Sequence, residues 1–378
     1  MTKQTLLTLA TALFCTGSAV CNDQRPPNIL FVFADDFAYN AVGFMGNDEV
    51  RTPNLDTLAS QGTVFNNCYN SGAWHGAICI ASRTMLYTGA QLWTAKANEK
   101  TAKSIYVESG KTWPQRLSAL GYKTYFTGKW HVQDFHPDAV HDAVAKPLPG
   151  MPNTNVGNQY LRPTADGSDH WDATKQDGSG FWKGGTHWTK LTTDHALELL
   201  DRAAKEPDTP FFLTVSYNAP HDPRQSPREV LDTYDVDKIK VPENFMPVYP
   251  IQPKNMGLGK NWNLRDERLA PVPRTDLMVR THRREYYSAI TYLDQQVGRI
   301  FDALKTAGLE KNTLVIFTAD HGLACGEHGL MGKQNPHEHS VRVPFLLAGP
   351  GIPKKERREQ LLYLQDVVPF SLENAGAK

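Results

Sequence analysis

The sequence predicts an α/β fold in which a mainly parallel central sheet is sandwiched by helices. Residues 28–34 form an unbroken apolar run, which is typical of a strand buried on both faces of a sheet. Further apolar runs of strand length alternate along the chain with stretches of helical periodicity. The chain has 378 residues, which is long enough to bury such a sheet without disulfide support.

Each predicted element has a recognisable beginning and end. The first helix begins at Thr52-Pro53, where an N-cap residue precedes a proline at the first helical position, and it ends before Gly62. The later elements follow the same rules. The other predicted helices are residues 112–120, 193–205 and 286–307, and the other predicted strands are residues 122–127, 211–217 and 313–318.

Two long irregular stretches interrupt this alternation, at residues 135–190 and 224–280. Both are rich in proline, glycine, aspartate and aromatic residues. Loops of this length in a compact domain are usually functional rather than simple connections. We therefore expect them to form the walls of a substrate cleft.

The first 19 residues have the features of an export signal. Lys3 gives the segment a positively charged start. Residues 6–14 form an apolar stretch, and residues 17–19 form a cleavage site of small residues. The apolar segment is too short to span a bilayer, which takes about 20 residues. We predict that residues 1–19 are removed and that the protein is exported to the periplasm or medium without a membrane span. The bulky residue before Cys21 argues against lipid attachment there, and the alternative for the whole segment is a buried N-terminal element.

The composition excludes several classes of protein. The 40 Lys and Arg residues balance the 40 Asp and Glu residues, and no basic run occurs, so we expect no nucleic-acid partner. A hydrophobic content of 40% and 8 Trp residues exclude global disorder. The cysteines beyond the signal follow no disulfide spacing, so at least one needs another explanation. They are Cys21, Cys68, Cys79 and Cys325.

Ionisable side chains gather where four predicted strands end. They are Asp35 and Asp36, Lys129 and His131, His221, and Asp320 and His321. In open α/β sheets ligands bind at the carboxyl ends of the strands, so we expect these distant positions to converge. Any one pair could be a turn or a cap instead, but four clusters at four strand ends favour a site.

A short motif indicates which kind of site this is. Residues 79–83 read Cys-Ile-Ala-Ser-Arg, and Thr-Gly follows at residues 88–89. This resembles the signature of the type I, formylglycine-dependent sulfatases of the alkaline phosphatase superfamily. Matching segments run in order along nearly the whole chain, at residues 28–36, 52–56, 121–131, 217–221, 318–322, 326–329, 332–333 and 342–344.

The resemblance implies a fold, a modification and a boundary. It implies an alkaline phosphatase-like catalytic domain, which we place at residues 28–375. It also implies that a formylglycine-generating enzyme oxidises Cys79 to formylglycine (3-oxoalanine). Sulfatases usually continue into a small antiparallel C-terminal subdomain. Because the chain stops at Lys378, we expect that subdomain to be missing.

A divalent cation is the expected cofactor. Asp35, Asp36 and Asp320 supply hard oxygen ligands, which suit Ca²⁺, with Mg²⁺ as the other possibility. By resemblance, the modified Cys79 and the residue after Asp320 complete the metal shell. That residue is often Asn in the family but is His321 here, and imidazole is a less typical Ca²⁺ ligand.

The expected site attracts an anion. Three carboxylates against a divalent cation and the side chains of Arg83, Lys129 and Lys333 leave a formal charge of about +2. By resemblance, Arg83 lies one helical turn after position 79 and orients the hydrated aldehyde.

The mechanism implied by the resemblance is covalent. One hydroxyl of the hydrated aldehyde at position 79 attacks sulfur, while Lys129 and Lys333 offset charge on the sulfuryl oxygens. His221, with Lys333, protonates the departing alcohol. His131 then deprotonates the second hydroxyl, and the sulfate is released.

Several functional alternatives stay open on the sequence. The expected substrate is a sulfated carbohydrate or a small sulfate ester. A related phosphonate or phosphate ester hydrolase is the first alternative, and a non-catalytic binder of sulfated ligands is the second. An unmodified, inert thiol at Cys79, the commonest fate of a free cysteine, would favour the binder.

Overall fold

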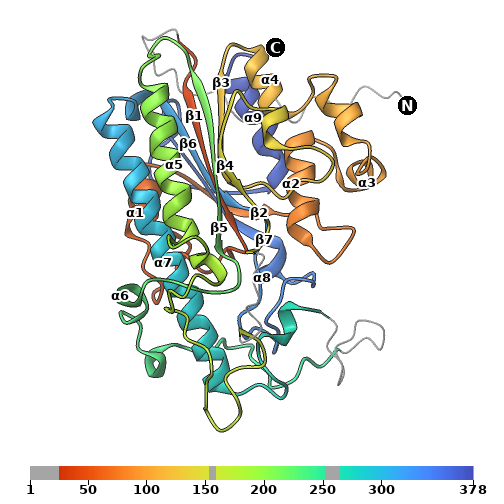
Figure 1. The fold of residues 1–378 in the computed structure, drawn as a ribbon, viewed down its shortest axis with the longest axis vertical. Helices are drawn as coiled ribbons and strands as arrows, with labels where there is room; N and C mark the ends of the chain where they lie inside the picture. The colour runs from red at the N-terminus through yellow and green to blue at the C-terminus, as the bar shows by residue number, and fades with distance from the viewer. Residues whose placement is uncertain (1–24, 153–158, 252–263, 378) are drawn as a thin grey trace.

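The structure is a computed structural model that describes residues 25–152, 159–251 and 264–377. In these residues an eight-stranded sheet runs through the centre, with the order β4-β3-β5-β1-β6-β7-β2-β8. Helices cover both of its faces (Figure 1). The predicted α/β class, a mainly parallel sheet between layers of helices, is confirmed. The predicted signal peptide at residues 1–19 and Cys21 lie outside the described residues.

The elements have the following bounds. The strands are β1 (Asn28–Asp35), β2 (Gly62–Tyr69), β3 (Lys123–Lys129), β4 (Ala143–Leu148), β5 (Phe211–Pro220), β6 (Thr313–Ala319), β7 (Arg342–Ala348) and β8 (Glu356–Tyr363). The helices are α1 (Pro53–Ser60), α2 (Ile78–Thr88), α3 (Leu92–Ala97), α4 (Trp113–Ala119), α5 (Trp188–Ala203), α6 (Arg228–Leu231), α7 (Asp276–Thr306), α8 (Glu338–Val341) and α9 (Val367–Asn374).

The centre of the sheet is fully buried. β1 pairs in parallel with β5 on one side and β6 on the other, so that Phe31 lies opposite Thr214 and Ile316. Every residue of these three strands is buried, as their continuous apolar runs predict. Each large apolar side chain buried in this way contributes about 1.5–3 kcal/mol to the folded state. The departure from parallel pairing is β7, which runs antiparallel to β2 and β6.

Different helices form the two layers that cover the sheet. Helices α1, α5 and α7 cover one face of the sheet, and α2, α4 and α9 cover the other (Figure 1). On the second face Trp113 of α4 packs edge-on against Phe31, with 5.0 Å between ring centroids. On the first face the long helix α7 starts at an N-cap where the Thr275 hydroxyl accepts a hydrogen bond from the Met278 amide.

Two helices begin earlier than the sequence predicts. α5 starts at Trp188 rather than residue 193, and α7 starts at Asp276 rather than residue 286. The first ten residues of α7 are mostly polar, so they lack an apolar stripe. Four of them are nevertheless buried. One of the four, Glu285, pairs with a distant loop, and its carboxylate accepts two hydrogen bonds from Arg162 at 2.5 and 2.9 Å.

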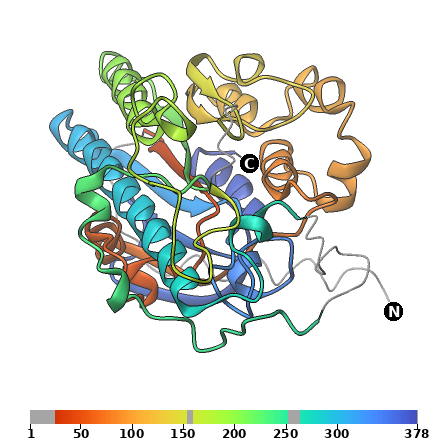
Figure 2. The ribbon, with the colours of Figure 1, turned by 60° about the horizontal axis from the view of Figure 1, so that its bottom comes forward.

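The carboxyl ends of β1, β3, β5 and β6 lie at one end of the molecule. Figure 2 turns this end forward, and long connecting segments gather over it. The residues that follow these strands therefore meet at a common edge, as the parallel topology requires. No helix in the described parts of the chain is both long and apolar enough to cross a bilayer.

Candidate active site

Cys79 is the second residue of α2 and only 2% exposed. Its sulfur lies 3.5 Å from Nε2 of His321 and 3.8 Å from Nζ of Lys333. Burial raises the pKa of the Cys79 thiol to about 12, although the Lys333 ammonium opposes the shift. An unmodified thiol at this position is therefore protonated at neutral pH and is a weak nucleophile.

The next turn of α2 fixes the end of β6. The Ser82 hydroxyl donates to the backbone carbonyl of Asp320 at 2.8 Å. Arg83 Nε donates to the Asp320 carboxylate at 3.0 Å, and one of its terminal nitrogens donates to the Lys129 carbonyl and to the Ser216 hydroxyl. The guanidinium is fully buried, so this one side chain ties the ends of three strands together.

Three buried carboxylates surround the sulfur of Cys79. Asp35, Asp36 and Asp320 are at most 2% exposed. Ligand atoms of Asp35, Cys79, Asp320 and His321 all lie within 4.8 Å of one another. Oδ1 of Asp35 is buried without a hydrogen-bond partner among the described residues. A buried, unpaired carboxylate oxygen beside two further carboxylates is costly without a cation, so these residues fit a hard divalent metal.

His321 belongs to this group in the structure. Its Nε2 lies 3.1 Å from Oδ1 of Asp36 and 3.6 Å from Oδ1 of Asp320, so the ring nitrogen points into the carboxylate cluster. A second group of ligand atoms within 4.8 Å joins Asp35, Asp36 and Cys79 to His221. The sequence analysis did not predict His221 as a possible metal ligand.

Two buried lysines face the carboxylates. Lys129 forms a very short ion pair with Asp35, and Nζ of Lys333 lies 2.8 Å from both carboxylate oxygens of Asp36. Burial lowers the pKa of Lys129 to about 7, against the opposing effect of Asp320. Burial acts on Lys333 in the same direction, but Asp36 together with Cys79 and Asp266 outweighs it and raises the pKa of Lys333. Lys333 is therefore a fixed positive charge beside Cys79.

His221 follows β5 and faces the same cluster. Its Nε2 lies 3.6 Å from Oδ2 of Asp36, while its Nδ1 lies 2.7 Å from the Asp222 carbonyl. Burial, together with the positive charges of Lys333 and Lys129, holds the pKa of His221 well below its ordinary value. The imidazole is therefore neutral, with Nδ1 as the donor and Nε2 free to accept a proton on the side of the site.

His131 lies at the edge of the cluster, two residues beyond β3, with a left-handed φ of 58°. Its ring packs against Gly150, where an added Cβ would lie 2.4 Å from the ring. Burial and the neighbouring charge of Lys129 lower the pKa of His131 to about 2. Its Nδ1 is buried and has no hydrogen-bond partner among the described residues.

The structure thus brings the predicted side chains to one place. The sequence analysis did not predict a set of charged residues that contact these side chains. Arg265 donates to both Asp222 oxygens at 2.6 and 2.9 Å, and the Asp266 carboxylate lies 3.9 Å from Lys333. The only sequence signal was a charged run at residues 265–268 inside a long irregular stretch. The run does not show which partners it meets.

Glu267 supports the backbone that carries Lys333. Its carboxylate accepts hydrogen bonds from the amides of Met331 and Gly332, at 3.0 and 2.9 Å, and from Arg274 at 2.8 Å. The carboxylate is 2% exposed, so a buried ion pair holds this loop. Gly150 and the residues 265–267 come from the two stretches predicted as cleft walls, and both stretches reach the site.

The mainly parallel sheet and the helices on both of its faces give the chain a fold of the alkaline phosphatase-like class. Within that class the chain belongs to the sulfatase family. The family model, described as Sulfatase, matches residues 27–377. The resemblance in the Cys79 motif and the prediction of a sulfatase-type enzyme are therefore confirmed at the level of the family.

Named relatives agree with this assignment. The chain is 28% identical over 379 residues to an arylsulfatase of Clostridium perfringens, covering 92% of this chain and 75% of the relative. It is 29% identical to the iduronate 2-sulfatase of Mus musculus over 86% of this chain, and it spans only 59% of that protein's length. A solved structure of a protein in complex with its substrate D-glucosamine-2-N,6-O-disulfate shares the fold with a TM-score of 0.70 and 22% identity, covering 94% of this chain and 77% of the other.

Proposed function

We propose that this protein hydrolyses sulfate esters, with a nucleophile formed at Cys79 by oxidation to formylglycine and with Ca²⁺ or Mg²⁺ at the adjacent carboxylates. The observation that carries the proposal is the position of Cys79. Its sulfur lies in a buried group of metal-ligating atoms and 3.8 Å from the Lys333 ammonium, in a chain of the sulfatase family.

The metal would be held by Asp35, Asp36, Asp320 and His321, with the modified residue 79 as a further ligand. When bound, such a cation supplies Lewis-acid polarisation of the reacting oxygens. Ser82 and Arg83 hold Asp320 from behind, so its carboxylate keeps a fixed orientation towards the cation.

The lysines are proposed to bind the sulfuryl oxygens. A metal ion would compete with Lys129 for Asp35 and with Lys333 for Asp36. Each ammonium would then have hydrogen bonds to offer to the substrate. Two buried cations act strongly on an anion because the site excludes water. Arg83 donates to Asp320, Lys129 and Ser216, which supports a positioning role for its side chain.

The histidines are proposed to move protons. His221 is neutral in the free protein, and its Nε2 faces the site. An arriving anion offsets the charges of Lys333 and Lys129 and so raises the pKa of this imidazole, which allows it to protonate the departing alcohol. Burial and the charge of Lys129 keep His131 neutral in the free protein. A bound anion would offset the charge of Lys129 and raise the pKa of His131, which would allow the imidazole to accept a proton from the hydrated residue 79.

The substrate, the maturation partner and the location of the protein are proposals as well. A sulfated carbohydrate or a small sulfate ester fits the anion-seeking site, and the structural relative described above was solved with a sulfated glucosamine. A formylglycine-generating enzyme would be the maturation partner. Residues 1–19 support export to the periplasm or medium, and the position of Cys21 does not favour a lipid anchor.

The test uses protein made together with a formylglycine-generating enzyme and assayed with Ca²⁺. We expect the parent to hydrolyse 4-nitrophenyl sulfate with a higher kcat/KM than 4-nitrophenyl phenylphosphonate, and Cys79→Ser to lose turnover by at least about 10³-fold. Unchanged turnover in Cys79→Ser would exclude the formylglycine mechanism. Faster hydrolysis of the phosphonate would favour the phosphonate hydrolase. Binding without turnover in both forms would favour the non-catalytic protein.

A further inference from the structure

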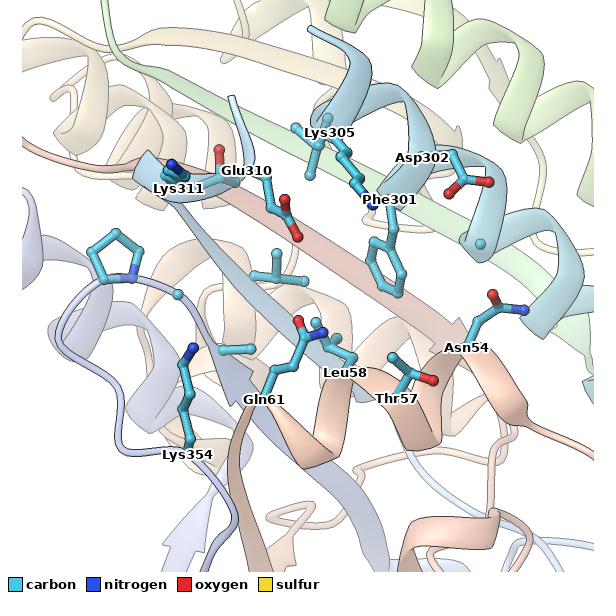
Figure 3. Close-up of a pocket in the computed structure, with 17 residues that line it drawn as sticks. Asn54, Thr57, Leu58, Gln61, Phe301, Asp302, Lys305, Glu310, Lys311 and Lys354 are labelled. Atoms are coloured by element: carbon cyan, nitrogen blue, oxygen red, sulfur yellow. The ribbon is translucent and has the colours of Figure 1, made fainter. Parts of the chain in front are cut away.

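A hollow of about 600 Å³ lies at the end of the sheet opposite to the proposed active site. The charged side chains of Lys305, Glu310 and Lys354 stand around it (Figure 3). Thr313, the first residue of β6, lines it, whereas Asp320 follows the last residue of that strand. At about 3.3 Å per residue the two ends of β6 are about 20 Å apart. Residues around this hollow therefore do not touch the reacting groups, and further contributors to the reaction lie at the carboxyl edge of the sheet.

At that edge, Nδ1 of His221 faces two oxygen atoms of the next residue. The Asp222 carbonyl oxygen lies 2.7 Å from Nδ1, and the carboxylate oxygen Oδ1 lies 3.1 Å from it. Both oxygens accept hydrogen bonds, so Nδ1 carries the proton and donates it to them. The ring is therefore held at two points, with Nε2 on the side of Asp36 and the site.

The Asp222 carboxylate is in turn held by a bidentate ion pair. Its side chain is 4% exposed, and the two terminal nitrogens of Arg265 donate to Oδ2 and Oδ1 at 2.6 and 2.9 Å. Oδ1 is also the oxygen that faces His221. A guanidinium fork that engages both carboxylate oxygens fixes the plane of the carboxylate. The orientation of Asp222 towards His221 is therefore set by Arg265.

Arg265 is anchored on the side away from His221. It forms a very short ion pair with Asp266 and donates to the Tyr160 hydroxyl at 3.4 Å. The Asp266 carboxylate also accepts a hydrogen bond from Gln334 at 3.0 Å. A continuous series of polar contacts thus runs from the turn at residues 266–269 through Arg265 and Asp222 to His221.

We infer that Arg265 is a positioning residue for the protonation of the departing alcohol. It orients the Asp222 carboxylate, which holds the His221 ring with Nε2 towards the ester oxygen. The inference rests on the proposed sulfatase function, in which the bond from sulfur to the ester oxygen breaks and the proton on Nε2 passes to that oxygen. Arg265 and Asp222 exchange no proton with the substrate and act through His221.

The effect of a misplaced proton donor depends on the leaving group. 4-Nitrophenolate is a weak base and departs with little help from a proton. Phenolate is a much stronger base and needs a proton as the bond to sulfur breaks. A misoriented His221 should therefore slow the hydrolysis of phenyl sulfate much more than that of 4-nitrophenyl sulfate, whereas a general disturbance of the site slows both alike.

The first experiment compares the parent, Arg265→Lys and Asp222→Asn on the two esters, with protein made together with a formylglycine-generating enzyme and assayed with Ca²⁺. Lys keeps the charge of Arg265 but loses the fork, and Asn keeps the shape of Asp222 but loses its charge. We expect each variant to lower kcat/KM about 30-fold on phenyl sulfate and less than about threefold on 4-nitrophenyl sulfate.

The matched control is Arg268→Lys, at an exposed residue of the adjoining turn, and it should keep the parental values on both esters. Because the Arg265 side chain is 34% exposed, Arg265→Lys still decides the question if Asp222→Asn does not fold. Equal losses on the two esters in Arg265→Lys, or no loss on either ester, would overturn the inference.

The second experiment uses the double variant to test whether Arg265 acts through Asp222. If it does, Arg265→Lys should add less than about twofold to the loss that Asp222→Asn shows on phenyl sulfate. Two losses that multiply in full would mean that the residues act separately, which would overturn the inference.

Inhibition by inorganic sulfate distinguishes positioning from direct contact with the sulfuryl group. We expect its inhibition constant to change less than about twofold in Arg265→Lys. Inhibition weakened at least about tenfold would assign Arg265 to substrate binding and overturn the inference. A parent that hydrolyses neither ester contradicts the proposed function and the inference with it, whereas an active parent with equal losses in the variants contradicts the inference alone.

Discussion

Arg83 shows how one side chain links the motif to the sheet. The sequence predicted it as a site residue from the spacing of the motif, and the resemblance implied that it orients the residue at position 79. The structure shows where its hydrogen bonds go: to Asp320, to the Lys129 carbonyl and to Ser216. No spacing rule predicts these partners, because they lie 46 to 237 residues away in the sequence.

We predict that Arg83→Lys is destabilised by about 3 kcal/mol, because Lys cannot replace the three directed hydrogen bonds and leaves Asp320 poorly paired in a buried place. Turnover of 4-nitrophenyl sulfate should fall at least about 100-fold, since Asp320 loses its orientation. Chemical denaturation and steady-state kinetics measure the two effects. Arg202→Lys on the exposed side of α5 is the control and should change stability by less than about 0.5 kcal/mol. Similar values for both variants would contradict the role of Arg83.

Single residues also show which parts of the site the sequence could not predict. Strand-end patterning and the Cys79 motif predicted the side chains that face the centre. They did not predict Asp222, Arg265 or Glu267, which support those side chains from behind. A supporting ion pair has no fixed spacing along the chain, since its members meet only after folding.

The loop that carries Lys333 is held by an element far from it in sequence. Glu267 lies in a short 3₁₀ turn at residues 266–269. Its carboxylate accepts hydrogen bonds from the backbone amides of Met331 and Gly332. Its carboxylate also pairs with Arg274. The turn therefore fixes the backbone just before the ammonium that lies beside Cys79.

We expect Glu267→Gln to lower kcat/KM at least about tenfold, because the amide of Gln cannot accept from both backbone amides and leaves Arg274 without its counter-ion. The free energy of unfolding should fall by about 2–3 kcal/mol. Kinetics and urea denaturation provide the two readouts. The control is Glu310→Gln, at an exposed position after α7. If Glu267→Gln kept parental kinetics, the loop would not depend on this carboxylate.

At the element scale the four strands β3, β5, β1 and β6 were predicted, whereas the largely buried β7 and β2 and the edge strands β4 and β8 were not. β1, β5 and β6 are mostly apolar and buried along their whole length, so their sequence pattern predicts them directly. β8 is a mostly exposed, highly charged edge strand, and β4 lies inside a stretch predicted to be irregular. Their strand conformation comes from pairing with β2 and β3, which is a tertiary effect that local sequence does not record.

The whole molecule should lose stability in mild acid because it buries neutral histidines outside the site. Burial lowers the pKa of His141 and of His187 to about 4, from an ordinary value of 6.5. Between these values the unfolded chain binds more protons than the folded one, so stability rises with pH. Each histidine should therefore cost about 3 kcal/mol as the pH falls from about 6.5 to about 4.

Denaturation curves at pH 7, 6, 5 and 4 check this prediction. In His141→Phe, which keeps an aromatic ring against Phe126 and Trp130, the loss over this range should be smaller by about 3 kcal/mol. His136→Gln, at an exposed residue, should follow the parent curve. An identical pH slope in the parent and His141→Phe would show that His141 does not couple folding to protons.

A bound cation should stabilise the whole fold. Three clustered carboxylates repel each other without it, so Ca²⁺ at about 100 times its Kd should add about 2.7 kcal/mol. Thermal unfolding with Ca²⁺ and with a chelator measures this shift. Asp320→Asn should abolish turnover and most of the shift while the protein remains folded. Full activity after exhaustive chelation would contradict the metal assignment.

The central claim is that Cys79 becomes the formylglycine nucleophile of a sulfatase. Fragmentation mass spectrometry of the tryptic peptide covering residues 52–83 tests it most directly, on protein made with a formylglycine-generating enzyme. Because Cys68 lies on the same peptide, the fragments must locate the change. The account predicts a residue mass lower by about 18 Da at Cys79 and an unchanged Cys68. An intact thiol at Cys79, in cells whose enzyme converts a control sulfatase, would contradict it.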